Sequence, residues 1–596
     1  MGYRTLKSCV DDLRRTRQLV EFNEEVDPYL ELAAVQRRLY AAGAPAVLFT
    51  RPKNCRFPML ANLFGTEKRI EYIFRDGIEP LRKAIQWGAD PLQSRLELSL
   101  SFGMSGWFSR PKFVRRAPVL ACKTTLDQLP QLVSWQQDGG AYITLPQVYT
   151  EDPNHPGIGR SNLGMYRVQI SGNDYIPQQE AGLHYQIQRG IATHHAAALR
   201  SGKPLPVNVF IGGAPAMTVA AVMPLPEGFS ELRFAGILGR HRIPFRTYYQ
   251  DTLAFPDGYE ILLPIYAEAD FCLTGWLIHS KVKPEGPFGD HLGYYSLAHD
   301  FPVFYVENVF HRKDAIFPFT VVGRPPQEDT EFGKFIHHLV GDVVQRKLPG
   351  VRAVHAVDEA GVHPLLLAVG RESYLPLDPN RRAAELHTLA HAMLGFGQLS
   401  LAKYLFLAAE EDDLSVDDTA QFLQHVLRRV NRRDDVHFVT RTTADTLDYT
   451  DSELHRGSKL FVAVSGKPRR QLAESLPESL PCKNPRFSMP GVLCAEEIDW
   501  NGTFPDEIPL IVLVDNSMEA TASLRNFLWT TFTKSDPASD VHGIGEFVEN
   551  KHWGCTGAVV IDARRKPHHA PELVEDPDIA RRAEKITEKI LSLQDR

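Results

Sequence analysis

From about residue 126 to residue 340 the sequence is a succession of short β-rich runs separated by glycine and proline. Examples are AYITLPQVYT, MYRVQISG, PVNVFIGG, FCLTGWLIHS and PVFYVENVFHR. Many short strands joined by turns are typical of a β-barrel or a β-sandwich. We therefore predict a central β-barrel-like domain at residues 126–345.

The sequence on both sides of this domain alternates between helical and strand-like segments. Residues 30–43 have apolar side chains at helical spacing and end at Gly43, and residues 44–49 (APAVLF) have the composition of a short buried strand. Such alternation predicts α/β domains. We expect one at residues 1–125 and another at residues 346–596.

The C-terminal α/β domain carries an extended tail. Its last stretch, residues 576–596, is an amphipathic helix of mixed charge, expected to pack on the body of the protein or on a second subunit. We therefore assign the tail to oligomerisation, as a homodimer or a larger homo-oligomer. Residues 465–508 contain several prolines and serines and are predicted to be a loop or linker. The pattern elsewhere predicts helices at 384–397, 417–430 and 517–532 and strands at 403–409 and 508–517.

Composition excludes several classes of protein. The 66 basic and 73 acidic side chains give a net charge of −7, so no basic excess is present to neutralise a nucleic-acid backbone. The seven cysteines are scattered and form no C-x-x-C pair, which is typical of reduced thiols in the cytoplasm. Residues 207–225 are almost entirely apolar, but their glycines and prolines favour a buried strand, a turn and a short helix over a membrane span. We predict a cytoplasmic protein without a transmembrane segment or a secretory signal.

Two familiar motifs are incomplete. GFGQLS at 395–400 begins like a dinucleotide-binding G-x-G-x-x-G, but it ends a helix instead of joining a strand to one. His387 and His391 are four residues apart on a predicted helix, yet the glutamate of H-E-x-x-H is missing between them. We interpret the two histidines as part of a half-buried helix face.

Three clusters in the central domain contain residue types that belong together chemically. They are RSNLGMYRVQ with Asn162 and Arg167, MPLPEGFSELRFAG with Glu231, and KPEGPFGDHLGYY with Glu285 and Asp290. Two acids placed near each other and near an arginine would have separated pKa values, one ionised and one able to carry a proton. Taken singly, each residue is more simply explained as a solvated turn, an exposed charge or a surface ion pair.

These clusters, in this order and at this separation, resemble the UbiD-type decarboxylases. The resemblance extends from about residue 140 to 345, through RSNLGMYR, MPLPEGFSE, PEGPFGDHLGYY and VVGRPP, and continues more weakly into both flanking domains. It implies that the central domain is a split β-barrel that binds prenylated FMN. It also implies an aryl-acid decarboxylase, a carboxy-lyase supplied with its cofactor by a flavin prenyltransferase.

The resemblance also implies a ligand set. Asn162, His184 and Glu231 match the positions that hold a divalent ion, Mn²⁺ or Mg²⁺, against the cofactor phosphate, and oxygen and nitrogen ligands suit such a hard octahedral cation. A nearby K⁺ would be held partly by the backbone of three residues, Ala220, Ala221 and Met223. The flavin would be lined by Met165, Tyr166, Arg167, Arg189 and Gly190, and Lys403 would reach its phosphate.

Arg167, Glu285 and Asp290 match the catalytic arginine–acid–acid network of the family. A cofactor must supply the electron sink when CO₂ leaves an sp² carbon, and an acid must then deliver a proton to that carbon. Either Asp290 or Glu285 could be that acid. Asp at the third position resembles the ubiquinone-pathway branch and favours a hydroxyaryl acid.

The sequence differs in two ways from the ubiquinone-pathway members of this family, and both affect the choice of substrate. Residues 241–265 look like an insertion, and the chain is longer than the ubiquinone-pathway form, mostly beyond residue 465. That long form resembles members associated with menaquinone made through futalosine, so a hydroxynaphthoate is the leading substrate and a polyprenyl-hydroxybenzoate the second. The alternatives are a decarboxylase of another aryl or α,β-unsaturated acid, an FMN-dependent reductase or oxidase on a split barrel, and a non-catalytic flavin carrier or scaffold.

Overall fold

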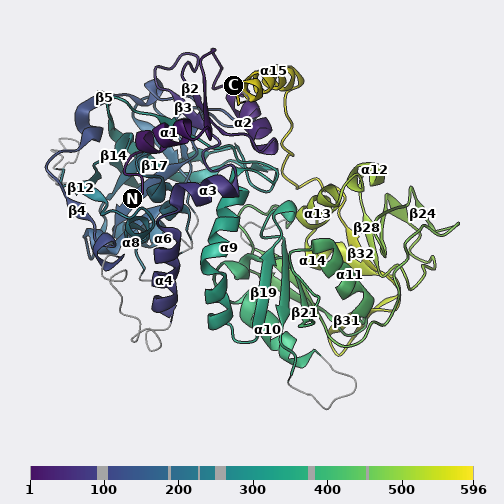
Figure 1. The fold of residues 1–596 in the computed structure, drawn as a ribbon. Coiled ribbons are helices and arrows are strands. Elements are labelled where there is room, and N and C mark those ends of the chain that lie inside the picture. The colour runs from purple at the N-terminus through teal and green to yellow at the C-terminus, as the bar shows by residue number, and fades with distance from the viewer. Residues whose placement is uncertain are drawn as a thin grey trace. The chain divides into compact units, whose positions relative to one another are not determined.

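The protein is represented by a computed structural model, which describes residues 2–89, 105–185, 190–223, 225, 229–248, 263–373, 383–451 and 456–594. The chain forms two compact units (Figure 1). The first comprises Met1–Asp290, Tyr295–Gly341 and Glu572–Arg596, and the second His291–Tyr294 and Asp342–Pro571. The α/β and β multi-domain class predicted from the sequence is confirmed, whereas the predicted domain boundaries stay a prediction.

The first unit begins with a small α/β layer. The predicted helix at 30–43 is α2 (Glu31–Ala41), which buries its apolar face, and the predicted strand is β2 (Ala46–Phe49). β2 lies between parallel β1 (Leu19–Phe22) and antiparallel β3 (Met59–Ala61), and β18 (Phe317–Pro318) extends the sheet. The helices of this part of the chain are α1 (Leu6–Arg15), which contacts β1, α3 (Glu67–Phe74) and α4 (Ile78–Ala89).

A nine-stranded sheet forms the centre of the first unit. Its path is β6 (Tyr142–Ile143), β9 (Val168–Gln169), β10 (Glu180–Leu183), β17 (His299–His311), β14 (Phe271–Glu285), β11 (Leu205–Ile211), β7 (Pro146–Glu151) and β8 (Ser161–Gly164), and β5 (Cys122–Thr124) pairs with β17. No pairing among the described strands joins β6 to β8. The predicted barrel is therefore not confirmed, because the pattern of short strands does not determine whether the two ends of a sheet meet.

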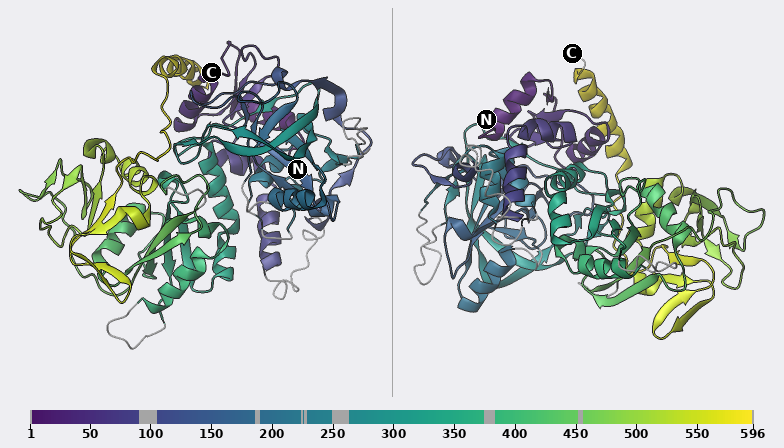
Figure 2. Two further views of the ribbon diagram at one scale, coloured as in Figure 1. Left: turned by 180° about the vertical axis from the view of Figure 1, so that it is seen from behind. Right: turned by 60° about the horizontal axis from the view of Figure 1, so that its bottom comes forward.

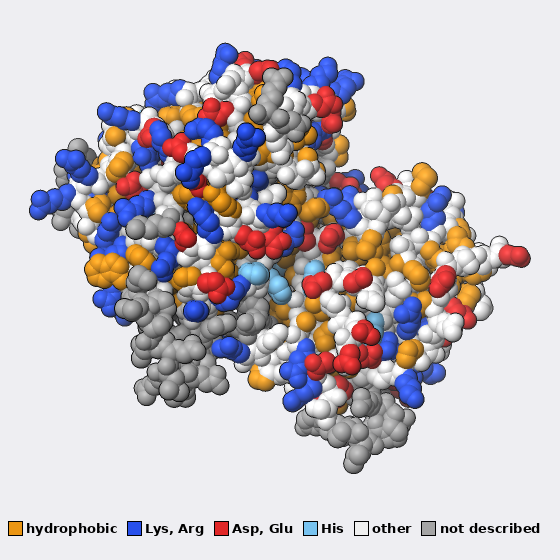
Figure 3. Space-filling model, in the orientation of Figure 1, with side chains coloured by type: hydrophobic (Ala, Val, Ile, Leu, Met, Phe, Trp, Pro, Cys, Tyr) orange, Lys and Arg blue, Asp and Glu red, His pale blue; other side chains and the backbone are white. Residues whose placement is uncertain are grey.

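The apolar stretch at 207–225 has the predicted form. β11 ends at Ile211, a turn follows at Gly212 and Gly213, and α7 (Pro215–Val222) begins with proline in its first turn. Both elements are buried in the first unit. Within the described part of the chain, no helix combines the length and apolar character that crossing a bilayer requires. Charged side chains of both signs are interspersed on the face drawn in Figure 3.

The first unit also contains several short strands and two further helices. The small strands are β4 (Lys112–Phe113), β12 (Pro244–Arg246) and β13 (Ile265–Tyr266), which form one sheet, and β15 (Phe288–Gly289) and β16 (Tyr295–Ser296), which form another. The helices are α6 (Gly190–Ser201) and α8 (Glu231–Leu238). Most of the insertion predicted at 241–265 lies outside the described residues.

The C-terminal helix α15 (Pro577–Gln594) returns to the first unit and packs on α2 (Figure 2). Arg37 and Arg38 of α2 form ion pairs with Glu575, just before α15, at 2.7 and 2.8 Å. The predicted packing of this helix on the body of the protein is thus confirmed.

The described part of the second unit contains two five-stranded sheets and two small two-stranded ones. The first runs β19 (Val351–Ala356), β20 (Leu365–Gly370), β21 (Tyr404–Ala409), β23 (Gly457–Val464) and β22 (Val436–Thr442), with α10 (Ala384–Leu394) and α11 (Thr419–Arg429). The second runs β25 (Arg486–Met489), β26 (Val492–Ala495), β28 (Leu510–Leu513), β32 (Val559–Asp562) and β29 (Val541–Gly543). The other elements are α14 (Pro537–Asp540), β24 (Cys482–Lys483), β27 (Glu497–Ile498), β30 (Glu546–Glu549) and β31 (His552–Cys555). Helix α9 (Glu328–Lys347) spans the boundary with the first unit.

Two predictions for this unit need correction. Residues 465–508 are not a plain linker, because β24–β27 lie within them and β26 is fully buried in the second sheet. The helix predicted at 517–532 is two helices, α12 (Ser517–Ala520) and α13 (Leu524–Thr533). Ser523 separates them because its side chain accepts the Asn526 backbone N–H and starts α13 as an N-cap.

Candidate active site

A buried ionic network joins three of the predicted residues within the first unit. Arg167 donates to Glu285 through Nε and Nη2, at 2.9 Å each, and through Nη1 to Asp290 Oδ2 at 2.5 Å. Its Nη2 also donates to Ser296 Oγ at 2.8 Å. The side chain of Glu285 is 0% exposed and that of Asp290 is 11% exposed. The structure thus brings together the arginine and the two acids that the sequence placed in one network.

The strands explain why residues so distant in sequence meet. Arg167 immediately precedes β9, which pairs with β10, and β10 pairs with β17. Glu285 is the last residue of β14, opposite His299 of β17. The Arg167 guanidinium also lies over the Phe288 ring of β15, 4.5 Å from its centroid. Each charged group is therefore positioned at a strand end by pairing that is non-local in sequence.

The charges in this network stabilise one another. Burial alone would raise the pKa of Glu285, but Arg167 and His184 hold that pKa well below its usual value. Burial opposes the positive charge of Arg167, yet Glu285 and Asp290 outweigh it and raise the pKa of the guanidinium. Glu285 is consequently a permanent carboxylate and Arg167 a permanent cation near neutral pH.

His184 lies in the same network. Its Nδ1 is 3.1 Å from Glu285 Oε2, and its ring stacks on Phe301 with centroids 4.2 Å apart. Burial, followed by the Arg167 charge, lowers the pKa of this imidazole. The structure therefore pairs His184 with a catalytic candidate, and its predicted role as a metal ligand stays a prediction.

Asp138 is a part of the site that the sequence did not reveal. Its Oδ1 accepts the Gly289 N–H at 2.8 Å, and its Oδ2 accepts the N–H groups of Ser134 and Trp135 at 2.9 Å each. Asp138 thus orders the segment that leads from Glu285 to Asp290. It lies in SWQQDGG, which matches no motif, so no local signal could have identified it.

Asp138 should make the stability of the fold depend on pH. Burial raises its pKa to about 6, so between the usual Asp value of 3.8 and 6 only the folded state retains the proton. Raising the pH through this window therefore favours unfolding, by about 1 kcal/mol between pH 5 and pH 7. In denaturant unfolding at both pH values, the loss of stability should be smaller in Asp138→Asn than in the wild type by about this amount. Equal pH slopes for the two proteins would contradict the assignment.

Gly289 is needed for close packing of the same segment. A Cβ at this position would lie 2.0 Å from Cδ1 of Trp135, whose ring is held by a 2.9 Å hydrogen bond from Nε1 to the Val322 carbonyl. We expect Gly289→Ala to cost about 1–3 kcal/mol of stability through overpacking, and to lower turnover by displacing Asp290. Thermal unfolding and turnover should be measured beside Gly159→Ala, whose added Cβ would meet nothing within 4 Å. Identical behaviour of the two variants would show that the segment adapts freely.

One predicted ligand of the divalent ion is a buried amide with a donor left unpaired by the described part of the chain. Asn162 of β8 is buried, and its Nδ2 has no hydrogen-bond partner among the described residues, while its Oδ1 accepts the Tyr166 O–H at 3.3 Å. A Cβ on Gly190 would come within 2.5 Å of Asn162 Oδ1, so glycine keeps the space beside this amide open. Glu231 is the first residue of α8. An unsatisfied buried amide beside open space fits a site for a polar group such as a phosphate with its cation.

The structure shows contacts for some of the other predicted cofactor residues, but these contacts do not test their roles. The Ala221 carbonyl accepts the Met165 N–H at 2.8 Å, which ties α7 to β8 and brings the proposed K⁺ and flavin residues together. Lys403 is buried in the second unit, where it pairs with Asp448 at 2.8 Å. Arg189 lies outside the described residues. The roles of all these residues, Ala220 and Met223 included, stay predictions.

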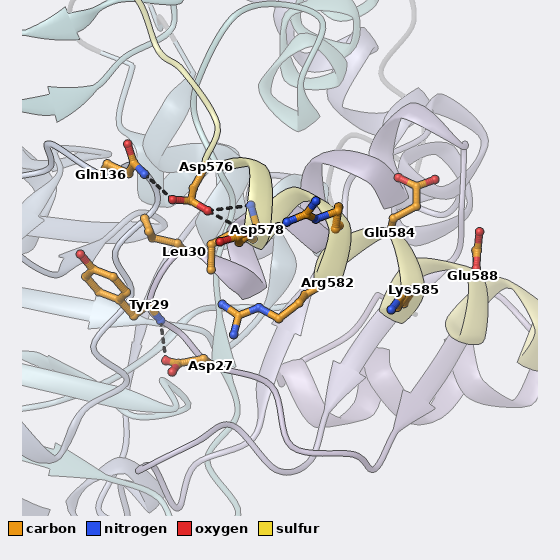
Figure 4. Close-up of a pocket in the computed structure, with 12 residues that line it drawn as sticks. Asp27, Tyr29, Leu30, Gln136, Asp576, Asp578, Arg582, Glu584, Lys585 and Glu588 are labelled. Carbon is orange, nitrogen blue, oxygen red and sulfur yellow. Dashed lines mark hydrogen bonds and ion pairs between the residues drawn. The ribbon is translucent and has the colours of Figure 1, made fainter.

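A groove of about 1060 Å³ lies elsewhere in the first unit (Figure 4). It is lined by charged and polar side chains of α15 and of the segments around Tyr29 and Gln136, and Gln136 donates to Asp576 at 2.8 Å. None of the predicted site residues lines it. This groove is therefore distinct from the predicted catalytic network.

The residues of this network lie in a part of the chain that matches a known protein family. Residues 10–87, 112–325 and 330–464 match the N-terminal, Rift-related and C-terminal domains of 3-octaprenyl-4-hydroxybenzoate carboxy-lyase, UbiD. A Chlamydia pneumoniae protein, named as one subunit of a 4-hydroxybenzoate decarboxylase, is 36% identical over 591 residues, covering 96% of each chain. An uncharacterized protein of Archaeoglobus fulgidus is 31% identical and covers 79% of this chain and 93% of its own.

Solved structures with the same fold include a vanillic acid decarboxylase and a UbiD-class enzyme. Vanillic acid decarboxylase of Sedimentibacter hydroxybenzoicus in its closed form has a TM-score of 0.65 at 22% identity, over 80% of this chain and 96% of that one. HmfF of Pelotomaculum thermopropionicum in complex with FMN has a TM-score of 0.60 at 21% identity, over 79% and 97%. Together with the three matched domains, these likenesses show that the chain belongs to the UbiD family and is a decarboxylase, a carboxy-lyase.

Proposed function

We propose that this enzyme removes CO₂ non-oxidatively and reversibly from an aromatic carboxylic acid, using prenylated FMN. The observation that carries the proposal is the buried network in which Arg167 binds Glu285 through two N–H groups and Asp290 through a third. Such a cluster can keep one acid charged and present the other to a substrate.

The two acids are proposed to have different roles. Glu285 is fully buried, and its oxygens face Arg167 and His184, so it remains a carboxylate that orients the guanidinium. Asp290 is held through Oδ2 by Arg167 and would carry the proton. When the bond between the ring carbon and CO₂ breaks, Asp290 would transfer its proton to that carbon, which completes the exchange of C–C for C–H.

Prenylated FMN, when bound, supplies the electron sink for the departing CO₂. Its phosphate and a divalent ion, Mn²⁺ or Mg²⁺, would be held by Asn162, Glu231 and His184. A K⁺ ion on the backbone of Ala220, Ala221 and Met223 would lie nearby. The remaining contacts would come from Met165, Tyr166, Arg167, Arg189, Gly190 and Lys403. A flavin prenyltransferase would supply the cofactor, and the likeness to HmfF, for which an evolved dimeric form bound to prenylated FMN is known, favours a homodimer or larger homo-oligomer.

The substrate is proposed to be a hydroxyaryl acid used in quinone biosynthesis. A hydroxynaphthoate is the first candidate and a polyprenyl-hydroxybenzoate the second. The name of the Chlamydia pneumoniae relative supports a hydroxyaryl acid. Klebsiella pneumoniae 3,4-dihydroxybenzoic acid decarboxylase, whose structure has a TM-score of 0.57 at 20% identity, shares the fold.

The test is to co-express the chain with a flavin prenyltransferase, record its absorption spectrum and measure CO₂ release from a panel of aryl acids. We expect a bound modified flavin and release from a hydroxynaphthoate or a hydroxybenzoate. Turnover only with an α,β-unsaturated acid would change the substrate class. Hydride transfer from NAD(P)H without CO₂ release from any acid would favour the flavin reductase and overturn the proposal.

A further inference from the structure

Three side chains of the second unit gather outside the network described above: His291, His363 and Asp445. We propose that they form a binding site for a divalent transition-metal ion of the zinc type. One nitrogen of each imidazole and one carboxylate oxygen all lie within 4.8 Å of one another. This site is separate from the proposed cofactor ion, whose ligands Asn162 and Glu231 belong to the first unit.

The distances suit a metal centre. His291 Nε2 is 3.7 Å from Asp445 Oδ2, the two rings are 5.9 Å apart between centroids, and His363 Nδ1 contacts the same oxygen directly. With metal–ligand bonds of about 2.0–2.2 Å, tetrahedral ligand atoms lie roughly 3.3 Å apart. Two imidazoles and one carboxylate therefore need only small shifts to enclose an ion.

The carboxylate is prepared for a cation. Asp445 has a side chain only 4% exposed, and its Oδ1 accepts the Leu447 N–H at 3.0 Å, which fixes the carboxylate plane. A ligand oriented by a backbone N–H is the usual support of a metal-binding carboxylate.

The surroundings allow an ion to enter. The side chains of His291 and His363 are 21% and 23% exposed, so solvent reaches both imidazoles, whereas Asp445 is buried. Of the nearby cations, Lys403 is paired with Asp448 at 2.8 Å, and Lys459 donates to the carbonyl oxygens of Ser400 and Ala402. Their charges are thus engaged by other groups.

The three ligand atoms determine which metal ions this site would bind. Two imidazole nitrogens and one carboxylate oxygen match three-ligand zinc sites that keep a fourth position for water, and also iron(II) sites of the two-histidine, one-carboxylate type. Ca²⁺ and Mg²⁺, which prefer oxygen ligands, suit this set poorly. Zinc or another borderline divalent ion is the expected occupant.

A bound ion would hold residues 291–294 in place, a segment that already packs in the second unit. In this unit, Trp529 Nε1 donates to the Leu292 carbonyl at 2.8 Å. The Trp529 ring also stacks on the Tyr294 ring, with centroids 5.2 Å apart. His363 lies before β20 and Asp445 after β22. A metal would therefore join three separate segments, and His291 directly follows Asp290 in the chain.

The test is cobalt titration of the full-length, tag-free protein after dialysis against a chelator. Co²⁺ in a site with two imidazoles gives visible absorption bands, and we expect about one equivalent with such bands, displaced by Zn²⁺, together with a higher unfolding temperature. His363→Ala and Asp445→Asn should each remove the bands and the temperature shift. Asp445→Asn keeps the side-chain shape and an oxygen for the Leu447 N–H, and circular dichroism will report whether each variant is folded.

The matched control is His355→Ala. His355 Nδ1 lies 3.3 Å from Asp417 in the same unit, a His–Asp pair that is not part of any group of three potential ligands among the described residues, so its loss should leave the bands unchanged. Glu231→Gln should also retain them, because that residue belongs to the proposed cofactor ion. The proposal is overturned if folded Asp445→Asn binds Co²⁺ with the same bands, or if the wild type shows none, in which case the triad is only an ion pair.

Discussion

Asp290→Asn is expected to lower kcat for CO₂ release about 10²- to 10⁴-fold, because the variant has no acid to return a proton to the ring carbon. The Asn side chain occupies the same volume, so the fold and cofactor binding should survive. The measurement is steady-state CO₂ release on an established aryl acid, with the absorption spectrum of the bound flavin recorded for each protein. A parallel assay of hydrogen exchange between product and D₂O would isolate the proton-transfer step.

Two comparisons make this result interpretable. Asp174→Asn makes the same chemical change at an exposed position of the same unit and should leave turnover unchanged. Glu285→Gln should also reduce turnover, but by removing the charge that orients Arg167. If Asp290→Asn retained full turnover while Glu285→Gln abolished exchange with D₂O, Glu285 would be the proton donor and the proposed roles would be reversed.

The residues of the network could be predicted because they lie in motifs that resemble a family. Periodicity gave no information on their contacts: Arg167 and Glu285 are 118 positions apart and meet through the pairing of β9, β10, β17 and β14. Predictions from local sequence patterns were confirmed where the structure depends on neighbouring residues. Gly43 ends the α2 region with a positive φ, and Gly212 and Gly213 turn the chain between β11 and α7.

The missed features depend on tertiary structure. Asp138 acts through three backbone N–H groups, one of them 151 positions away, so no spacing in the sequence marks it. The strands β24–β27 lie in a region rich in proline and serine, where strand pairing, and for β26 also burial in the second sheet, outweighs the local preference for loops. Whether the central sheet closes into a barrel also could not be predicted from the sequence, since closure depends on the shear and tilt of all the strands together.

Arg167→Ala is expected to destabilise the first unit by about 3–5 kcal/mol, because it leaves the buried Glu285 carboxylate and the Asp290 carboxyl group without their cation. Glu285 loses both N–H donors from Arg167, and Asp290 loses the donor to Oδ2. The pKa of Glu285 should rise once the guanidinium no longer opposes the effect of burial. The loss should therefore be larger at pH 8 than at pH 5, where protonation relieves the unpaired charge. Denaturant unfolding at the two pH values measures both effects.

A double variant separates charge from packing. Arg167→Met with Glu285→Gln removes the buried cation and one buried anion together while keeping long side chains, and should recover much of the stability lost in Arg167→Ala without restoring turnover. Arg15→Ala is the control for removing an arginine, because that side chain is 78% exposed and its pair with Asp12 should contribute nothing measurable. If Arg167→Ala unfolded at the same denaturant concentration as the wild type, the carboxylates would have to be solvated in the folded protein. The buried network could then not set the charges on which the proposed proton transfer depends.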